Sequence, residues 1–179
     1  MHVERKANGM TTSKGFKLFE MDTEGNLYPL FIDKQSVIPI GEWIEAKICP
    51  TKRFAVRPGF HLGLTVDAPW LKDANGQYKG RRKGWRRVWA ECEYVSENNY
   101  DEIVAELPNK CFTDRLPTNG FYRFKESGVD RWWIICDKIK VIRILSEDDR
   151  KQILDSQGYD EEAAFLPYKK SFEKRMKRP

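Results

Sequence analysis

The segment Arg87–Val95 constrains the fold more than any other part of the sequence. Its even-numbered positions from 88 to 92 are apolar, and they alternate with Trp89, Glu91 and Glu93. This alternation is typical of a strand, and the two glutamates, which share the face opposite Val88, Ala90 and Cys92, are expected to point toward solvent. Because similar short runs recur throughout residues 15–145, the sequence predicts an α+β fold: a mainly antiparallel, curved sheet with short helices and a C-terminal helix.

Turn residues separate the other expected strands. The turn chemistry of Asp22–Asn26 predicts a hairpin, and Pro29 places its second strand at a sheet edge or at a strand start. Asp67 is expected to cap a short helix that contains Pro69. Further strands are expected at residues 15–21, 27–32, 43–48, 59–66, 120–124 and 132–144. Residues 100–107 are compatible with a helix, and the rest of 96–130 is left open.

The two ends differ from the central segment. Residues 1–14 are polar and are expected to form a flexible lead-in to a single domain at 15–145. Residues 146–179 are expected to form C-terminal helices and a basic tail. Ser146 and the three acidic residues after it predict a helix start, and Gly158 predicts its end. A second, short helix is expected from Asp160 to Leu166.

Composition limits the class of protein. Hydrophobic residues make up 40% of the 179 residues, enough for one packed core, which excludes disorder throughout the chain. The net charge of +5 is too small to indicate a nucleic-acid partner by itself. The positions of the charges along the chain are more informative. The first residues lack the apolar stretch of a signal peptide, and no run approaches about 18 apolar residues. We therefore expect a cytoplasmic protein with no membrane contact.

The cysteines and histidines favour no metal site. Cys49, Cys92, Cys111 and Cys136 form no CxxC pair, and the chain has only two histidines. This usage is typical of reduced thiols in a cytosolic protein. The sequence also contains no P-loop, GxSxG or HExxH signature, which removes the commoner hydrolase and metalloenzyme classes. We expect no bound metal and assign no cofactor.

The strongest local charge lies in a glycine-punctuated segment at residues 72–86. We expect an exposed basic loop there that leads into the Arg87–Val95 strand. Lysine and arginine neutralise phosphates, and Trp85 or Tyr78 could stack on a base, as in proteins that bind single strands. The alternative is a loop that only aids solubility. The residues expected to contact nucleic acid are Lys79, Arg81, Arg82 and Lys83.

His61 is the only histidine within the expected domain. Its imidazole can donate to a ligand or exchange protons near neutral pH. The alternative is a half-buried histidine bonded to a backbone carbonyl. A ligand bound near His61 and the basic loop would contact His61, Arg57, Trp85, Arg86, Arg87 and Glu91.

Trp132 and Trp133 are adjacent, so in a strand they point to opposite faces. One ring is then exposed or covered by another element. An exposed ring would indicate a ligand pocket or a partner surface, and packing by the C-terminal helix is the alternative.

The order of several motifs resembles a group of small, uncharacterised proteins of tailed bacteriophages and prophages. The motifs lie at residues 15–19, 29–32, 39–46, 50–61, 87–93 and 138–143. The resemblance implies a phage origin, and therefore the cytoplasm of a bacterial host, but it carries no activity. Relative to that group, residues 72–86 and 96–130 are insertions.

A weaker likeness is to ADP-ribosyltransferase-like folds. It implies that His61 contacts the ribose of NAD and that Glu91 or Glu93 polarises the reacting sugar; the middle aromatic motif of those enzymes has no counterpart here. Three hypotheses result. The first is a phage-encoded binding protein for a nucleotide-like or other phosphate-bearing ligand, including single-stranded nucleic acid. The others are an accessory protein that binds a host or virion protein, and an ADP-ribosyltransferase-like enzyme.

Overall fold

A computed structural model of the chain describes residues 5–7, 9–49, 57–126, 128 and 131–177. Residues 50–56, which carry part of the phage-protein resemblance, lie outside this range. In chain order the elements are β1 (Arg5–Ala7), β2 (Met10–Met21), β3 (Leu27–Tyr28), β4 (Trp43–Glu45), β5 (Phe60–Gly63), the 3-10 helix η1 (Pro69–Leu71), β6 (Arg86–Val95), β7 (Asn98–Asn99), α1 (Asp101–Glu106), the 3-10 helix η2 (Pro108–Lys110), β8 (Gly120–Lys125), β9 (Trp132–Cys136), β10 (Lys138–Ile144), α2 (Glu147–Ser156) and α3 (Glu161–Met176).

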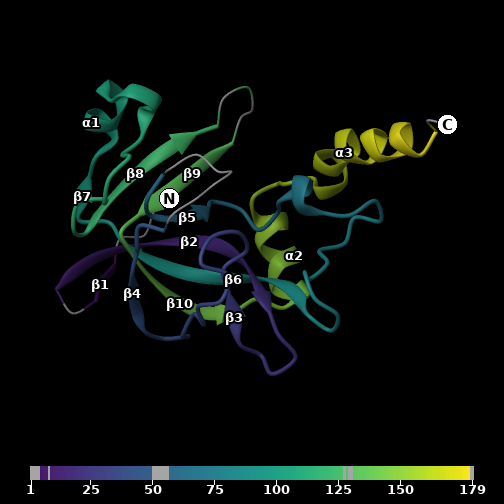
Figure 1. Cartoon of the computed structure of the whole chain (residues 1–179), viewed down its shortest axis with the longest axis horizontal. Coiled ribbons are helices and arrows are strands. Elements are labelled where there is room, and N and C mark those ends of the chain that lie inside the picture. The colour runs from purple at the N-terminus through teal and green to yellow at the C-terminus, as the bar shows by residue number, and fades with distance from the viewer. Residues whose placement is uncertain (1–4, 8, 50–56, 127, 129–130, 178–179) are drawn as a thin grey trace.

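The described strands form one sheet in the order β4-β10-β6-β2-β5-β9-β8-β7, and β1 and β3 also pair with β2 (Figure 1). All of these strand pairs are antiparallel except β7 with β8. The α+β prediction with a mainly antiparallel, curved sheet and a C-terminal helix is therefore confirmed. The long β2 lies at the centre, because it pairs with β6 over ten consecutive positions from Thr12↔Val95 to Met21↔Arg86.

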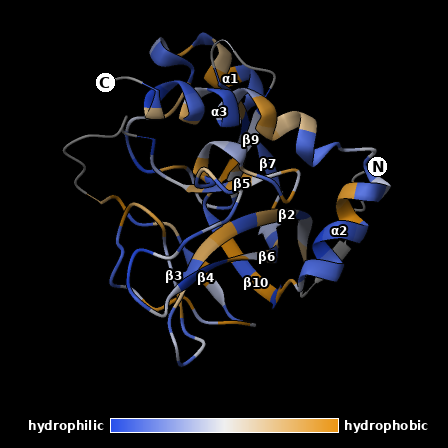
Figure 2. Cartoon of the chain, turned by 90° about the vertical axis from the view of Figure 1, so that its right-hand side faces the viewer, coloured by the Kyte–Doolittle hydropathy of each residue, from blue (hydrophilic) through white to orange (hydrophobic). Residues whose placement is uncertain are grey.

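The two faces of the sheet bury different clusters. The even-numbered residues of β6 from Val88 to Tyr94, with Phe19, Leu62 and Ile139 from other strands, form the main core on one face. Trp89 of β6 points to the other face, where Leu154 of α2 helps to cover it. Val104 of α1 packs over β8 and β9 in a third cluster. Figure 2 shows hydrophobic stretches along β2, which buries side chains on both faces of the sheet.

Several expected boundaries are wrong. Strands β3, β4 and β5 are shorter than the strands expected at 27–32, 43–48 and 59–66. Strand β2 begins at Met10, so the ordered sheet extends into the expected lead-in, and β1 pairs with β2 as well. The single strand expected at 132–144 is two strands, β9 and β10, with Asp137 between them. Asp67 does not cap the helix after it: Ala68 holds the cap position of η1 and makes no side-chain cap bond.

One prediction about the C-terminal helices is confirmed and one is wrong. Ser146 caps α2 as predicted, in a reciprocal capping box with Asp149. The helix expected to end before Pro167 instead continues through it to Met176, as α3. A proline costs about 3 kcal/mol in a helix interior, so α3 depends on contacts elsewhere. Among the described residues, no helix is long and apolar enough to cross a membrane.

Candidate functional site

His61 lies on β5, between β2 and β9, and is half-buried. Its Nε2 is 3.1 Å from the carbonyl oxygen of Arg57, and because a carbonyl only accepts, Nε2 carries the proton. Strands β2 and β5 pair only at Phe16↔Gly63. Lys17 of β2 donates from Nζ to the backbone carbonyl of His61 at 3.0 Å. These contacts match the alternative expected for His61, a half-buried histidine bonded to a backbone carbonyl.

The environment of His61 makes stability depend on pH. Burial, and secondly the nearby charge of Lys17, lower the pKa of His61 from 6.5 to about 4. Between these values the unfolded chain binds more protons than the folded chain, so stability is lost as pH falls from about 6.5 toward 4. We expect urea unfolding at several pH values to show this loss, and His61→Gln to reduce it. An equal pH dependence in both proteins would contradict the prediction.

The structure does not bring Glu91 next to His61. Phe16 on β2 pairs with Gly63 on one side and with Glu91 on the other, so a whole strand separates the two residues. The Glu91 carboxylate is 3.1 Å from Lys14 Nζ and 3.4 Å from Arg143 Nη2. Arg57 stacks over the ring of Phe124 at 4.4 Å. Each of these predicted ligand residues has its own local partner.

The basic segment folds into a small hairpin that precedes β6. Lys79 and Arg86 form an isolated antiparallel bridge, and the Trp85 amide donates to the carbonyl of Arg82 at 3.0 Å. Gly84 adopts a φ of +82°, a value that L side chains rarely adopt. At Gly80 a Cβ atom would lie 2.2 Å from the backbone oxygen of Trp85, so only glycine fits. The glycines that punctuate the sequence thus shape the hairpin.

Trp85 anchors this hairpin to the neighbouring strand β3. Its ring stacks on Tyr28 with a centroid distance of 5.0 Å and an interplanar angle of 27°. The guanidinium groups of Arg81 and Arg82 lie 5.1 and 4.8 Å from the Trp85 ring. The Tyr28 hydroxyl donates to Asp22 at 3.1 Å. The tryptophan is therefore held beside two cations.

The fold divides the predicted cations into two groups. The first group is engaged: Lys79 pairs with Asp73 at 3.0 Å, and Arg87 Nε pairs with the fully buried Glu20 at 3.1 Å. The Arg81 amide also donates to Glu20, at 3.2 Å. The second group is exposed and has no ion pair within the described part of the chain; it consists of Arg82, Lys83 and Arg86. With Trp85 and Tyr28, this second group forms what we call the basic-loop surface.

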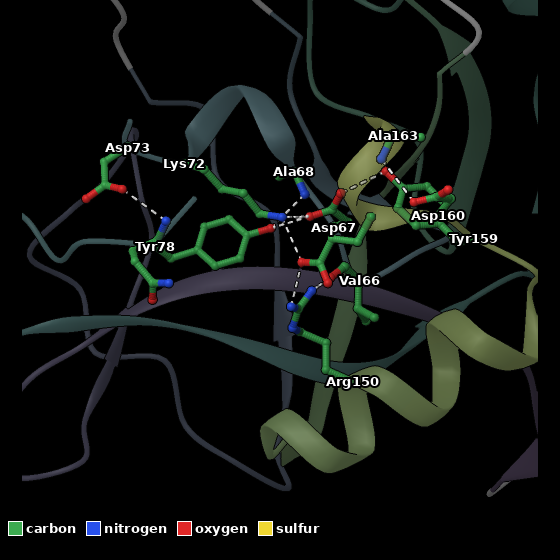
Figure 3. A network of polar contacts seen from close by, with 12 residues as sticks. Val66, Asp67, Ala68, Lys72, Asp73, Tyr78, Arg150, Tyr159, Asp160 and Ala163 are labelled. Carbon is green, nitrogen blue, oxygen red and sulfur yellow. Dashed lines mark hydrogen bonds and ion pairs between the residues drawn. The ribbon is translucent and has the colours of Figure 1, made fainter. Parts of the chain in front are cut away.

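A buried ionic network beside this surface was not predicted from the sequence (Figure 3). Lys72 Nζ lies 2.7 Å from a carboxylate oxygen of Asp67 and 2.7 Å from one of Glu161. The side chains of Lys72 and Asp67 are 3% and 0% exposed. Arg150 Nη2 is 2.6 Å from the same Glu161 oxygen. The network joins the start of the basic segment to α2 and α3.

Two tyrosines complete the network. The hydroxyls of Tyr78 and Tyr159 donate to the two oxygens of Asp67, each at 2.8 Å. Burial, followed by the charge and hydrogen bond of Asp67, raises the pKa of both phenols, so they remain donors at neutral pH. Burial alone would raise the pKa of Glu161, but hydrogen bonds from Lys72 and Arg150 outweigh it and lower that pKa. Every member is matched, which is the condition for a buried charge to persist.

Trp132 and Trp133 point to opposite faces of β9, as predicted. Trp133 contacts Trp70 edge-on at 5.8 Å and is partly covered. Trp132 remains 44% exposed, with Lys125 Nζ 5.5 Å from its ring centroid.

The described residues contain no group of three or more His, Cys, Asp or Glu side chains that could hold a metal ion. The four cysteines are free thiols, and burial raises the pKa of Cys92 to about 12, which makes it a poor nucleophile. Comparison of the chain with protein-family models, with curated proteins and with solved structures finds no match.

Proposed function

We propose that the protein binds a phosphate-bearing polyanion, most simply a single strand of nucleic acid, on the basic-loop surface. The observation that carries this proposal is the division of the cations into an engaged and an exposed group. Arg82, Lys83 and Arg86 are exposed and lack an ion pair in the described structure, while their neighbours Arg81 and Arg87 hold the hairpin in place. Unpaired cations on a fixed hairpin can neutralise phosphates without first breaking internal salt bridges.

The aromatic pair supports a nucleic acid over a simple phosphate. Proteins that bind single strands combine basic grooves with aromatic rings, on which bases stack with little sequence preference. Trp85 and Tyr28 are each partly exposed and lie directly beside Arg82. A base can stack at the edge of this pair while the adjacent phosphates contact the arginines.

His61 is not part of the proposed surface. Its Nε2–H is already bonded to Arg57, and its lowered pKa leaves the ring uncharged at neutral pH. A neutral imidazole adds no charge to a phosphate site, so we place the ligand at the hairpin.

The test measures binding of a fluorescent single-stranded oligonucleotide at several salt concentrations. For single strands, the slope of log K against log salt is about −0.7 for each phosphate neutralised. We expect the triple variant Arg82→Gln, Lys83→Gln, Arg86→Gln to bind more weakly and to show a slope smaller by about 2.

A matched control removes three exposed cations from other parts of the fold: Lys47→Gln, Lys110→Gln and Arg115→Gln. It changes the net charge equally, so a loss of affinity confined to the first triple variant assigns binding to the hairpin. Equal losses of affinity in both variants would show that binding depends only on net charge and not on the hairpin. Absence of binding by the native chain at low salt would refute the proposal.

The exposed Trp132 favours a second candidate, a protein-binding accessory role. A tryptophan ring that is 44% exposed is the kind of anchor that dominates protein interfaces. We expect Trp132→Ser to abolish capture of a protein partner while leaving oligonucleotide binding unchanged. Retained capture would exclude Trp132 as the anchor.

A further inference from the structure

Helix α3 contacts the rest of the molecule along one stripe only. Glu161 pairs with Lys72 and Arg150, and the guanidinium group of Arg131 donates to the Tyr168 hydroxyl at 3.4 Å. Phe165 lies between these two positions, with Lys72 Nζ 5.7 Å from its ring. The spacing i, i+4, i+7 places Glu161, Phe165 and Tyr168 on one face of the helix. No described residue of α3 is buried.

A second stripe lies on the opposite face. Lys170, Lys174 and Lys177 each follow one of these three docking residues by nine positions. Nine residues are two and a half helical turns, so these lysines point away from the body of the protein. Lys177 is the residue that ends the helix, and all three side chains are exposed.

The C-terminal half of α3 carries an excess of positive charge. From residue 169 to residue 177 there are five cations and one acid, Glu173. None of these five cations forms an ion pair in the part of the chain that the structure describes. The helix dipole favours cations in the last turn, which accounts for Lys174 and Arg175. It does not account for Lys169 and Lys170, which lie nearer the middle.

Helix α3 also has few stabilising contacts for its length. A helix without a buried face needs a partner or many internal ion pairs, and α3 further contains Pro167. Its cationic stripe spans about 10 Å along the helix axis, a length suited to successive phosphates of a nucleic-acid backbone. A polyanion would remove the mutual repulsion of the lysines.

Helix α3 docks on the basic segment through the face opposite the stripe. A Cβ atom on Gly76 would be 3.5 Å from the Phe165 ring, so residues 72–78 pack directly on α3. Lys72 ties this segment to Glu161. Figure 1 shows α3 and the loops that lead into β6 projecting on the same side of the sheet.

We infer that α3 is a second nucleic-acid-binding arm, whose stripe Lys170, Lys174 and Lys177 contacts the backbone of a strand that also reaches the basic-loop surface. This inference rests on the proposed function and extends it: the ligand is a strand long enough to contact both surfaces. A short oligonucleotide occupies the basic-loop surface alone.

The test compares the native chain with the triple variant Lys170→Gln, Lys174→Gln, Lys177→Gln on oligonucleotides of 5 and 25 nucleotides. Glutamine retains helix propensity, and circular dichroism checks that α3 is intact. For the longer strand we expect weaker binding and a salt slope smaller by about 2. For the shorter strand we expect no change.

The outcomes separate the two proposals. If the α3 variant binds the 25-nucleotide strand like the native chain while the basic-loop variant does not, the arm is overturned and the proposed function stands. If the native chain binds neither oligonucleotide, both fall. Binding of anionic lipid vesicles that depends on the stripe, without an effect on nucleic acid, would also overturn the inference.

Discussion

Replacing Lys72 by methionine is expected to lower the free energy of unfolding by about 3–5 kcal/mol. Lys72 is the only ammonium group that contacts Asp67 among the described residues, and both side chains are almost completely buried. Methionine fills a similar volume but leaves the Asp67 carboxylate with only hydrogen-bond donors and no opposite charge. The loss is measured by urea unfolding of the native and variant chains.

The matched control is Lys79→Met, which removes another lysine–aspartate pair of nearly the same length. That lysine side chain is 72% exposed, and exposed pairs contribute about 0–1 kcal/mol. Adding Asp67→Asn to Lys72→Met should recover part of the loss, because the uncompensated charge disappears. If Lys72→Met were as mild as Lys79→Met, the network would not stabilise the fold.

Replacing Glu20 by glutamine is expected to cost about 2–3 kcal/mol and to loosen the basic hairpin. Glu20 is fully buried, accepts from the Arg81 amide and pairs with Arg87. Glutamine keeps the shape but removes the charge that balances Arg87. Urea unfolding measures the loss of stability, and limited trypsin digestion at Arg81 and Arg82 measures the loosening.

Glu24→Gln is the control for Glu20, because Glu24 is exposed in the neighbouring turn. We expect it to alter neither stability nor the rate of cleavage measurably. Unchanged trypsin resistance in Glu20→Gln would show that the stack of Trp85 on Tyr28 holds the hairpin without the ion pair.

The strands could be predicted because their signals are local. The alternating pattern of Arg87–Val95 predicted strand β6. The turn residues Asp22–Asn26 predicted the hairpin of β2 with β3. The extent of α3 could not be predicted, since Pro167 opposes a helix locally while the contacts of Glu161 and Tyr168 lie far away in sequence. Tertiary contacts overrode local propensity there.

The candidate surface was only partly visible in the sequence. The run of cations indicated a basic loop, but which of them are engaged depends on Glu20 and Asp73 across the fold. The buried pair of Asp67 and Lys72 gave one weak signal, an acid and a base five residues apart around an apolar turn. Tyr159 and Glu161, which complete the network, come from the other end of the domain.

Photocross-linking would locate the ligand on the protein and so decide whether the basic-loop surface binds it. A single-stranded oligonucleotide that carries 5-bromouracil is cross-linked to the native chain at low salt, and the modified residues are identified by mass spectrometry. We predict cross-links to Trp85 and Tyr28, the aromatic residues of the basic-loop surface. Cross-links confined to the neighbourhood of His61, or none at all, would contradict binding at the hairpin.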